Sequence, residues 1–245
     1  VVVHGTLISP SRLKIKNSML SDSAAYGFEF NDGAIVDAFS NNVMTRNIKD
    51  PGSLPANLVG KLDTASSYTG NAFDQIFVVD NSSVTSDQTW PALNVPYSTG
   101  IHAINANLVI EAGATLIFRA SGQLNVSGTG SLAAIGTATR MITFTAAQQT
   151  PGYWAGIQYT SSNSNNNTLD NVVVEYAGGT GLSGQGGVIL YGSGALAPRA
   201  VIIDSVFRFS ASYGIWLDVN PLVNADIDTV NTFANNALGN VFRSP

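Results

Sequence analysis

Short apolar runs follow one another along the second half of the chain, with Gly or Asn between them. The runs are three to five residues long, and most are rich in β-branched or aromatic residues. These features are typical of β-strands. No apolar stripe with a period of 3.6 residues persists for three turns, so the chain is predicted to be nearly all β. The predicted strands are 108–110, 115–118, 123–126, 131–135, 141–144, 156–159, 172–176, 188–191, 200–203 and 214–217.

The residues between the runs indicate how the strands connect. Closely spaced strands with Gly-rich corners and Asn-dense turns favour a solenoid, in which each winding of the chain pairs with the next. Asn suits a corner because it tolerates left-handed backbone geometry and its amide can hydrogen-bond the Asn of the next winding. The predicted corner residues are Asn17, Asn41, Asn42, Asn71, Asn171, Asn235 and Asn236. Prolines in the less regular segment 48–100 predict longer loops there.

The first residues of the chain return near its end. Residues 12–30 align with residues 199–217 at an offset of 187 (199 − 12), with Tyr26 matching Tyr213. A second match, of 39–42 with 233–236, has an offset of 194 (233 − 39) and predicts about seven inserted residues. The chain, residues 1–245, is therefore predicted to be one continuous segment cut from a longer repeat array. Residues 1–187 form one repeat, and residues 188–245 begin the next.

Composition excludes several classes of partner and site. Only 11% of the 245 residues are charged, the net charge is −5, and Lys and Arg together number 11. The chain therefore offers no basic patch for nucleic acid or an anionic membrane. No apolar run approaches the roughly 20 residues that span a bilayer. The lack of cysteine removes disulfides, thiolate nucleophiles and Cys-based zinc sites.

Four residues in the second half of the chain are the candidates for ligand binding. Tyr153 and Trp154 follow a Pro-Gly turn and could present a flat face to a sugar ring, although the favoured interpretation is that Trp154 covers the edge of the core. Strand alternation places Tyr176 inside and Glu175 outside. With Asp170, Glu175 is the best pair of carboxylates for acid/base or calcium-assisted chemistry on a polysaccharide, but a solvated structural role is the simpler interpretation.

Other motifs have structural explanations. Gly179, Gly181 and Gly184 match a dinucleotide fingerprint in spacing, but a β run rather than a helix follows them, so a loop is expected. His4 and His102 lie too far apart in the sequence to indicate a shared metal or triad. Trp216 is predicted to point outward between Ile215 and Leu217. No catalytic residue, metal ligand or cofactor is predicted.

Three segments resemble a known family of repeats. Residues 110–146, then 151–159 (PGYWAGIQY) and 168–179 (TLDNVVVEYAGG), resemble the right-handed parallel β-helix repeats of large secreted bacterial surface proteins. The resemblance implies an all-β, right-handed parallel β-helix, that is, a single-stranded β-solenoid built from tandem long repeats. It also implies an extracellular or cell-surface location. The family includes adhesins, filament components and some polysaccharide-cleaving enzymes.

Together these observations favour a non-enzymatic extracellular module with a structural or adhesive role in a bacterial surface or filament protein. The expected partners are neighbouring repeats or copies of the same chain, stacked end to end, together with surface polysaccharide. The alternative is a carbohydrate-binding or polysaccharide-cleaving β-helix protein. That alternative places Tyr153, Trp154, Glu175 and Tyr176 near a groove. It predicts that at least two carboxylates, or one carboxylate with Arg140 or Arg199, converge there within reach of one sugar.

Overall fold

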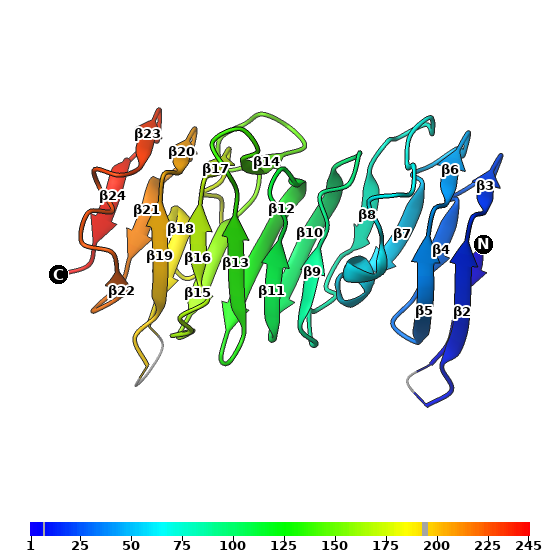
Figure 1. The fold of residues 1–245 in the computed structure, drawn as a ribbon. Helices are drawn as coiled ribbons and strands as arrows, with labels where there is room; N and C mark the ends of the chain where they lie inside the picture. Colours follow the sequence, from blue (N-terminus) through cyan, green and yellow to red (C-terminus); the bar gives the residue numbers. More distant parts are fainter. Residues whose placement is uncertain (7, 193–195) are drawn as a thin grey trace.

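The computed structural model describes residues 1–6, 8–192 and 196–245, so a small part of the predicted second repeat, residues 193–195, lies outside the described residues. Strands predominate, and the described residues hold one helical element, the 3₁₀ helix η1 (Ala56–Lys61). The all-β prediction is confirmed. Figure 1 shows the strands following one another along a long axis, with the two termini at opposite ends.

Fourteen strands form one large sheet, which branches at its longest strand, β12. The first half of β12 pairs with β14 and the second half pairs with β15. The path that ends in the first branch is β1 (Val2–Val3), β4 (Phe28–Phe30), β7 (Gly52–Pro55), β8 (Ile76–Val79), β10 (Tyr97–Ile104), β12 (Thr115–Ser127), β14 (Ile142–Ala146), β17 (Val172–Glu175), β20 (Val206–Arg208) and β23 (Thr232–Ala234). The second branch is β15 (Gly156–Thr160), β18 (Gly186–Tyr191), β21 (Tyr213–Leu217) and β24 (Gly239–Arg243).

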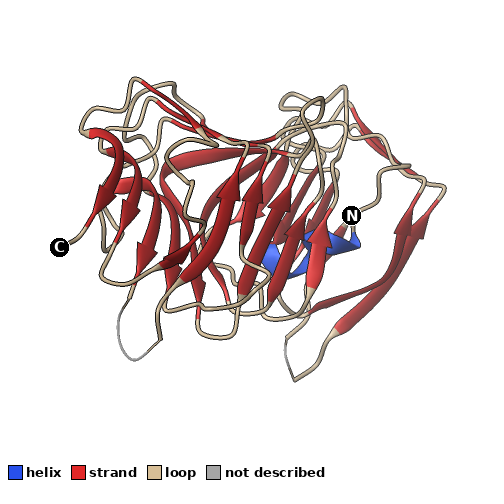
Figure 2. Cartoon of the chain, turned by 60° about the vertical axis from the view of Figure 1, so that its left-hand side comes forward, coloured by secondary structure: helices blue, strands red, loops and turns tan. Residues whose placement is uncertain are grey.

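The remaining strands form a six-stranded sheet and two strand pairs. The six-stranded sheet is β22 (Leu222–Val223), β19 (Arg199–Ile203), β16 (Thr168–Asp170), β13 (Ser131–Ile135), β11 (Asn107–Ile110) and β9 (Gln88–Trp90). The pairs are β2 (Ser11–Lys16) with β5 (Ala34–Ser40), and β3 (Met19–Ser21) with β6 (Val43–Thr45). In Figure 2 the strands stand as layers with the connecting loops gathered at their ends.

The pairing between these strands is parallel throughout the large and six-stranded sheets. Each pass of the chain through the sheets is a level. In the first part of the chain, hydrogen-bonded positions on neighbouring levels are 24 residues apart, as between Ser18 and Asn42. The separation reaches 33 residues near β17 and β20, because longer loops join the strands there. The structure therefore consists of large parallel sheets whose neighbouring strands come from successive passes of the chain.

The core lies on the inner face of the large sheet, where apolar side chains occupy one row. Phe28 pairs with Gly52, Gly52 with Ile76, Ile76 with Tyr97, and Tyr97 with Leu116. The four side chains of this row are fully buried. Gly52 is required because a Cβ there would lie 2.0 Å from the Phe28 ring. Close packing of this row fixes the register of the strands, since a one-residue slip would expose all of it.

The predicted corner asparagines divide into two groups with different roles. Four adopt the left-handed backbone conformation that Asn tolerates: Asn17, Asn41, Asn171 and Asn235. The other three, Asn42, Asn71 and Asn236, hydrogen-bond the main chain of the preceding level with both ends of their amides. Their Oδ1 atoms accept from a backbone N–H, and their Nδ2 atoms donate to a backbone carbonyl. The second group therefore joins levels instead of only turning the chain.

The two aligned segments make corresponding hydrogen bonds, but their second parts align differently from the prediction. Ser18 donates its N–H to Asn42, and its equivalent Ser205 donates to Asn231. Asn42 therefore matches Asn231 at an offset of 189 (231 − 42), and the predicted match of Asn42 with Asn236 is wrong. Relative to the first offset of 187, two residues are inserted rather than seven (189 − 187). Similar Asn pairs on successive levels caused the misalignment.

Candidate ligand-binding site

Glu175 ends strand β17 on the outer side of the large sheet, yet its side chain is nearly inaccessible. Only 8% of the residue is exposed, which corrects the prediction of a solvated carboxylate. Thr145 Oγ1 donates to Oε1 at 2.8 Å, and Arg208 Nε donates to Oε2 at 2.7 Å. Glu175 pairs in register with Arg208 on β20, so the ion pair crosses between adjacent strands. Both carboxylate oxygens are used to join three neighbouring strands.

Tyr176 follows at the corner, where it is half-buried and packs against the core instead of lying inside it as alternation predicts. Its φ of 60° is left-handed, which ends the strand alternation that would have turned the side chain inward. The same conformation recurs at Phe209, with a φ of 55°. Their rings stack with centroids 5.2 Å apart and planes 9° from parallel. The two rings form a half-buried aromatic column beside the Glu175–Arg208 pair.

Trp154 and Tyr153 differ in exposure although they are adjacent. Trp154 is fully buried and stacks on Phe118 with a centroid distance of 3.9 Å. Its indole Nε1 donates to the carbonyl oxygen of Glu175 at 2.8 Å. Tyr153 is half-buried, and its carbonyl accepts from the Ser121 N–H. Of the two interpretations of Trp154, this geometry is that of a side chain that covers the core, and it offers a ligand no surface.

Asp170 and Glu175 do not share a face. Asp170 ends β16 in the six-stranded sheet, whereas Glu175 ends β17 in the large sheet. Asn171, in the left-handed conformation, turns the chain between them and donates its amide to the Asp170 carboxylate at 2.7 Å. The two carboxylates therefore do not form the pair on one face that acid/base chemistry requires.

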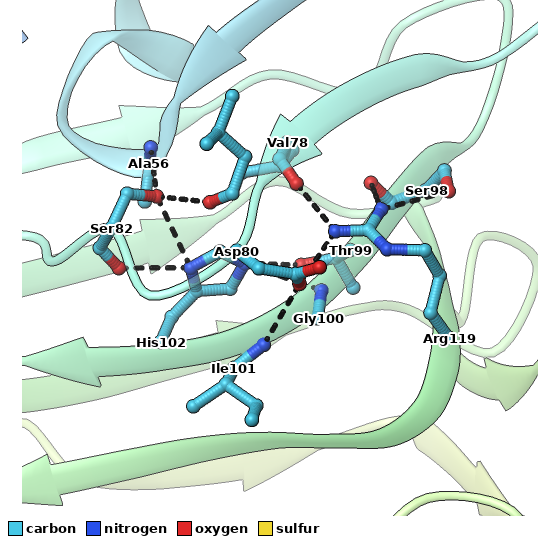
Figure 3. Close-up of polar contacts among 11 residues, drawn as sticks. Ala56, Val78, Asp80, Ser82, Ser98, Thr99, Gly100, Ile101, His102 and Arg119 are labelled. Atoms are coloured by element: carbon cyan, nitrogen blue, oxygen red, sulfur yellow. Dashed lines mark hydrogen bonds and ion pairs between the residues drawn. The ribbon is translucent and has the colours of Figure 1, made fainter.

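A second polar cluster, which the sequence did not indicate, surrounds His102 in β10 (Figure 3). His102 is 1% exposed, and both of its ring nitrogens have hydrogen-bond partners. Nδ1 lies 2.9 Å from the Ser82 carbonyl oxygen, which can only accept, so Nδ1 carries the proton. Nε2 accepts from the Gly100 N–H at 3.3 Å and lies 2.9 Å from Thr99 Oγ1. Burial lowers the pKa of His102 to about 4, so the ring is neutral at pH 7.

Arg119, at the bend of β12, lies beside this cluster and ties three strands together. It donates to the Asp80 carboxylate at 2.6 Å, to the Val78 carbonyl at 2.7 Å and to the Ser98 carbonyl at 2.8 Å. The guanidinium also lies 4.2 Å from the centre of the Phe77 ring. The only sign of these contacts in the sequence was a lone Arg after the apolar run 115–118. Its contacts join strands and do not enclose a space for a substrate.

The predictions for Trp216 and for the glycine-rich segment agree with the structure. Trp216 is half-buried on the outer side of β21, while Ile215 and Leu217 pack inward, as predicted. The segment from Gly179 to Gly184 is a loop that leads into strand β18, as expected. Residues 1–6, 8–192 and 196–245 contain no group of three or more His, Asp or Glu side chains placed to hold a metal ion. The same residues contain no helix of the length and apolar character that crosses a membrane.

Beside the aromatic column, the chain forms a groove of about 580 Å³. Loops that precede β15, β18, β21 and β24 provide its walls. Its lining residues are Pro151, Gly152, Gly178, Gly179, Thr180, Gly181, Leu182, Gly184, Gln185, Ala211, Ser212 and Leu238. The four sequence candidates are neighbours of this groove in the chain, but none of them is among the residues that line it.

Comparison with known proteins gives no match. No protein-family model, no curated protein and no solved structure matches this chain.

Proposed function

We propose that the chain is a non-enzymatic structural and adhesive module of an extracellular surface or filament protein, of the bacterial kind that the sequence resembles. In this proposal the parallel sheets are the faces of a right-handed parallel β-helix, a solenoid of tandem long repeats. Support comes from the register of the sheets, in which each strand lies beside its counterpart from the next pass of the chain. The resemblance to secreted surface repeats supports the location.

One observation carries the proposal: the polar side chains are used to join neighbouring levels rather than to surround a substrate. In the described residues, five arginines pair with carboxylates, and four of these pairs join residues 24 to 39 positions apart. The four are Arg12–Asp37, Arg46–Asp22, Arg119–Asp80 and Arg208–Glu175. The amides of Asn42, Asn47 and Asn71 join levels in the same way. This arrangement suits a rigid, elongated spacer.

The proposed partner is a neighbouring repeat or a second copy of the chain. Among the described residues, strands β1 and β24 each pair with one other strand, so each has a free edge at which a further strand can pair. A repeat with a similar path would continue both the sheet and the buried row. In this proposal the free edges of β1 and β24 also join copies of the chain end to end into filaments.

Sedimentation velocity over a range of concentrations tests the assembly. We expect an elongated particle whose sedimentation coefficient rises with concentration, and filaments or short rods by electron microscopy. A sedimentation coefficient that stays monomeric over the whole range would contradict stacking.

An edge variant makes the test specific. In β24 the Ser244 N–H already bonds the Leu217 carbonyl, so by strand alternation the Arg243 N–H faces the free edge. Arg243→Pro removes that donor and should weaken association several-fold. Arg243→Ala keeps the N–H while it also loses the ion pair with Asp228, so it should associate like the parent. Equal association of all three proteins would exclude this edge as the interface.

A further inference from the structure

Three aromatic side chains cluster on the outer side of the last two strands of the large sheet. Tyr213 and Trp216 come from β21, and Phe242 comes from β24. The rings of Trp216 and Phe242 stack at 5.8 Å with planes 13° apart, and the ring of Tyr213 lies 5.1 Å from that of Phe242. All three residues keep part of their surface exposed. Together they present an apolar aromatic wall to solvent.

The aromatic wall adjoins the groove of about 580 Å³ described above. Gly184 lines the groove, and a Cβ on it would lie 2.5 Å from the Trp216 ring, so backbone and ring are in contact. Gln185, the next lining residue, accepts the Tyr213 N–H through its carbonyl at 3.2 Å. On the far side, Leu238 precedes Gly239, whose Cβ position lies 3.6 Å from the Tyr213 ring. The wall and groove therefore form one continuous surface.

The surface of the groove combines apolar and polar groups without charge. No charged residue is among those that line the groove. Leu238 is 52% exposed and supplies apolar area. The side chains of Thr180 and Gln185 are exposed, and in the described part of the chain neither makes a hydrogen bond. Such a surface suits an uncharged ligand that has apolar faces and many hydroxyl groups.

The first copy of the repeat shows that the fold does not need the rings of Trp216 and Phe242. At the offset of 187 Trp216 corresponds to Glu29, and at the offset of 189 Phe242 corresponds to Ser53. The strands β4 and β7 that carry Glu29 and Ser53 pair in the same parallel way as β21 and β24. Since the pairing forms without the rings, they are available for another role.

We infer that the groove and its aromatic wall bind a neutral saccharide. A sugar ring lies against the exposed part of the Trp216 and Phe242 wall, and sugar hydroxyls bond the side chains of Gln185 and Thr180. The inference rests on the adhesive part of the proposed function, for which it names the ligand class and the site. It uses residues other than the four that the sequence indicated.

A glycan array with neutral oligosaccharides and matched uronic-acid oligosaccharides tests the ligand class. We expect at least one neutral oligosaccharide to bind and the acidic set to bind no better than background. Binding confined to the acidic set, or to no oligosaccharide, would overturn the inference. Stacking in the sedimentation experiment would be unaffected by that failure, so the two proposals are separable.

Fluorescence locates the site, because Trp90 and Trp154 are fully buried and Trp216 is partly exposed. Acrylamide quenching should therefore report mainly on Trp216, and the oligosaccharide that binds on the array should reduce it. Trp216→Ala should weaken binding tenfold or more, and Gln185→Ala, at an exposed position that leaves folding intact, about three- to tenfold. The control Glu29→Ala, at the equivalent position in the first copy, should bind like the parent. Unchanged binding in both test variants would place the saccharide elsewhere.

Discussion

The side-chain amide of Asn47 donates a hydrogen bond of 2.7 Å to Oδ1 of Asn71, which occupies the equivalent position 24 residues further along the chain. Asn47 is 2% exposed, and its own Oδ1 accepts the Ser23 N–H of the preceding level. One buried amide therefore connects three successive levels. Asn47 is therefore a structural link between levels.

Replacing Asn47 should destabilise the fold strongly. Asn47→Ala leaves the partly buried Ser23 N–H and Leu20 carbonyl without their partner, and an unsatisfied group costs about 1–3 kcal/mol when it is buried. We expect the free energy of unfolding to fall by about 2–4 kcal/mol in urea titrations. Asn163→Ala, at an exposed loop position, is the control and should change stability by less than about 0.5 kcal/mol. Equal stability of the two variants would show that the amide does not join the levels.

His102 should make the stability of the protein depend on pH. Its pKa is lowered from 6.5 to about 4 because burial disfavours the charged ring, so the unfolded chain binds a proton more readily than the folded one. The contribution of neutral His102 to the free energy of unfolding is complete above pH 6.5. It falls as the pH drops from 6.5 to 4 and changes no further below pH 4. At 1.36 kcal/mol for each pKa unit, the loss over this window is about 3 kcal/mol.

A variant without a titratable ring isolates this effect. His102→Gln is expected to be less stable than the parent at pH 7, but its stability should change less between pH 7 and pH 4. Urea unfolding at several pH values measures both slopes, and the carboxylates common to the two proteins cancel in the difference. Parallel slopes would mean that His102 titrates normally in the folded protein.

The sequence predicted the strands well because apolar runs and turn residues are local signals. The runs at 131–135 and 200–203 coincide with β13 and β19, except that β19 begins one residue earlier. Left-handed corners at Asn17 and Asn171 were also predictable, since Asn is among the few residues that tolerate them. Handedness and the cellular role were expected from resemblance alone, because no local pattern determines them.

The environment of the candidate side chains could not be predicted, since it depends on residues about 30 positions away. Alternation placed Glu175 on the outer side, but Thr145 and Arg208 from the flanking strands cover it. Tyr176 departs from alternation because its backbone is left-handed, which is uncommon for a bulky aromatic residue. The groove escaped prediction for the same reason: its lining residues come from four separate loops.

The Glu175–Arg208 pair should be more costly to break than to replace. Arg208→Ala removes the cation from a carboxylate whose side chain is only 10% exposed, so we expect a loss of about 1–3 kcal/mol in the free energy of unfolding. Adding Glu175→Gln removes the uncompensated charge and should recover at least half of that loss. Urea titrations of the parent, the two single variants and the double variant measure this coupling. A double variant whose loss equals the sum of the single losses would mean that the two side chains act independently.

Gly52 provides a test of the packed row. A Cβ at this position would lie 2.0 Å from Cζ of Phe28, and Phe28 is fully buried, so its ring cannot move into solvent. We expect Gly52→Ala to lower the free energy of unfolding by about 2–4 kcal/mol through overpacking. Gly192→Ala is the matched control, because the nearest atom to its Cβ is Pro198 Cδ at 3.5 Å, an ordinary contact.

The same clash predicts a compensating change. Phe28→Leu shortens the side chain that meets the new methyl group, so the loss in Phe28→Leu/Gly52→Ala should be smaller than the sum of the two single losses by at least about 1 kcal/mol. Thermal and urea unfolding of the four proteins give this coupling directly. Strict additivity would show that Gly52 is needed for its backbone freedom rather than for the space it leaves to Phe28, and the register argument for the buried row would then lose its main support.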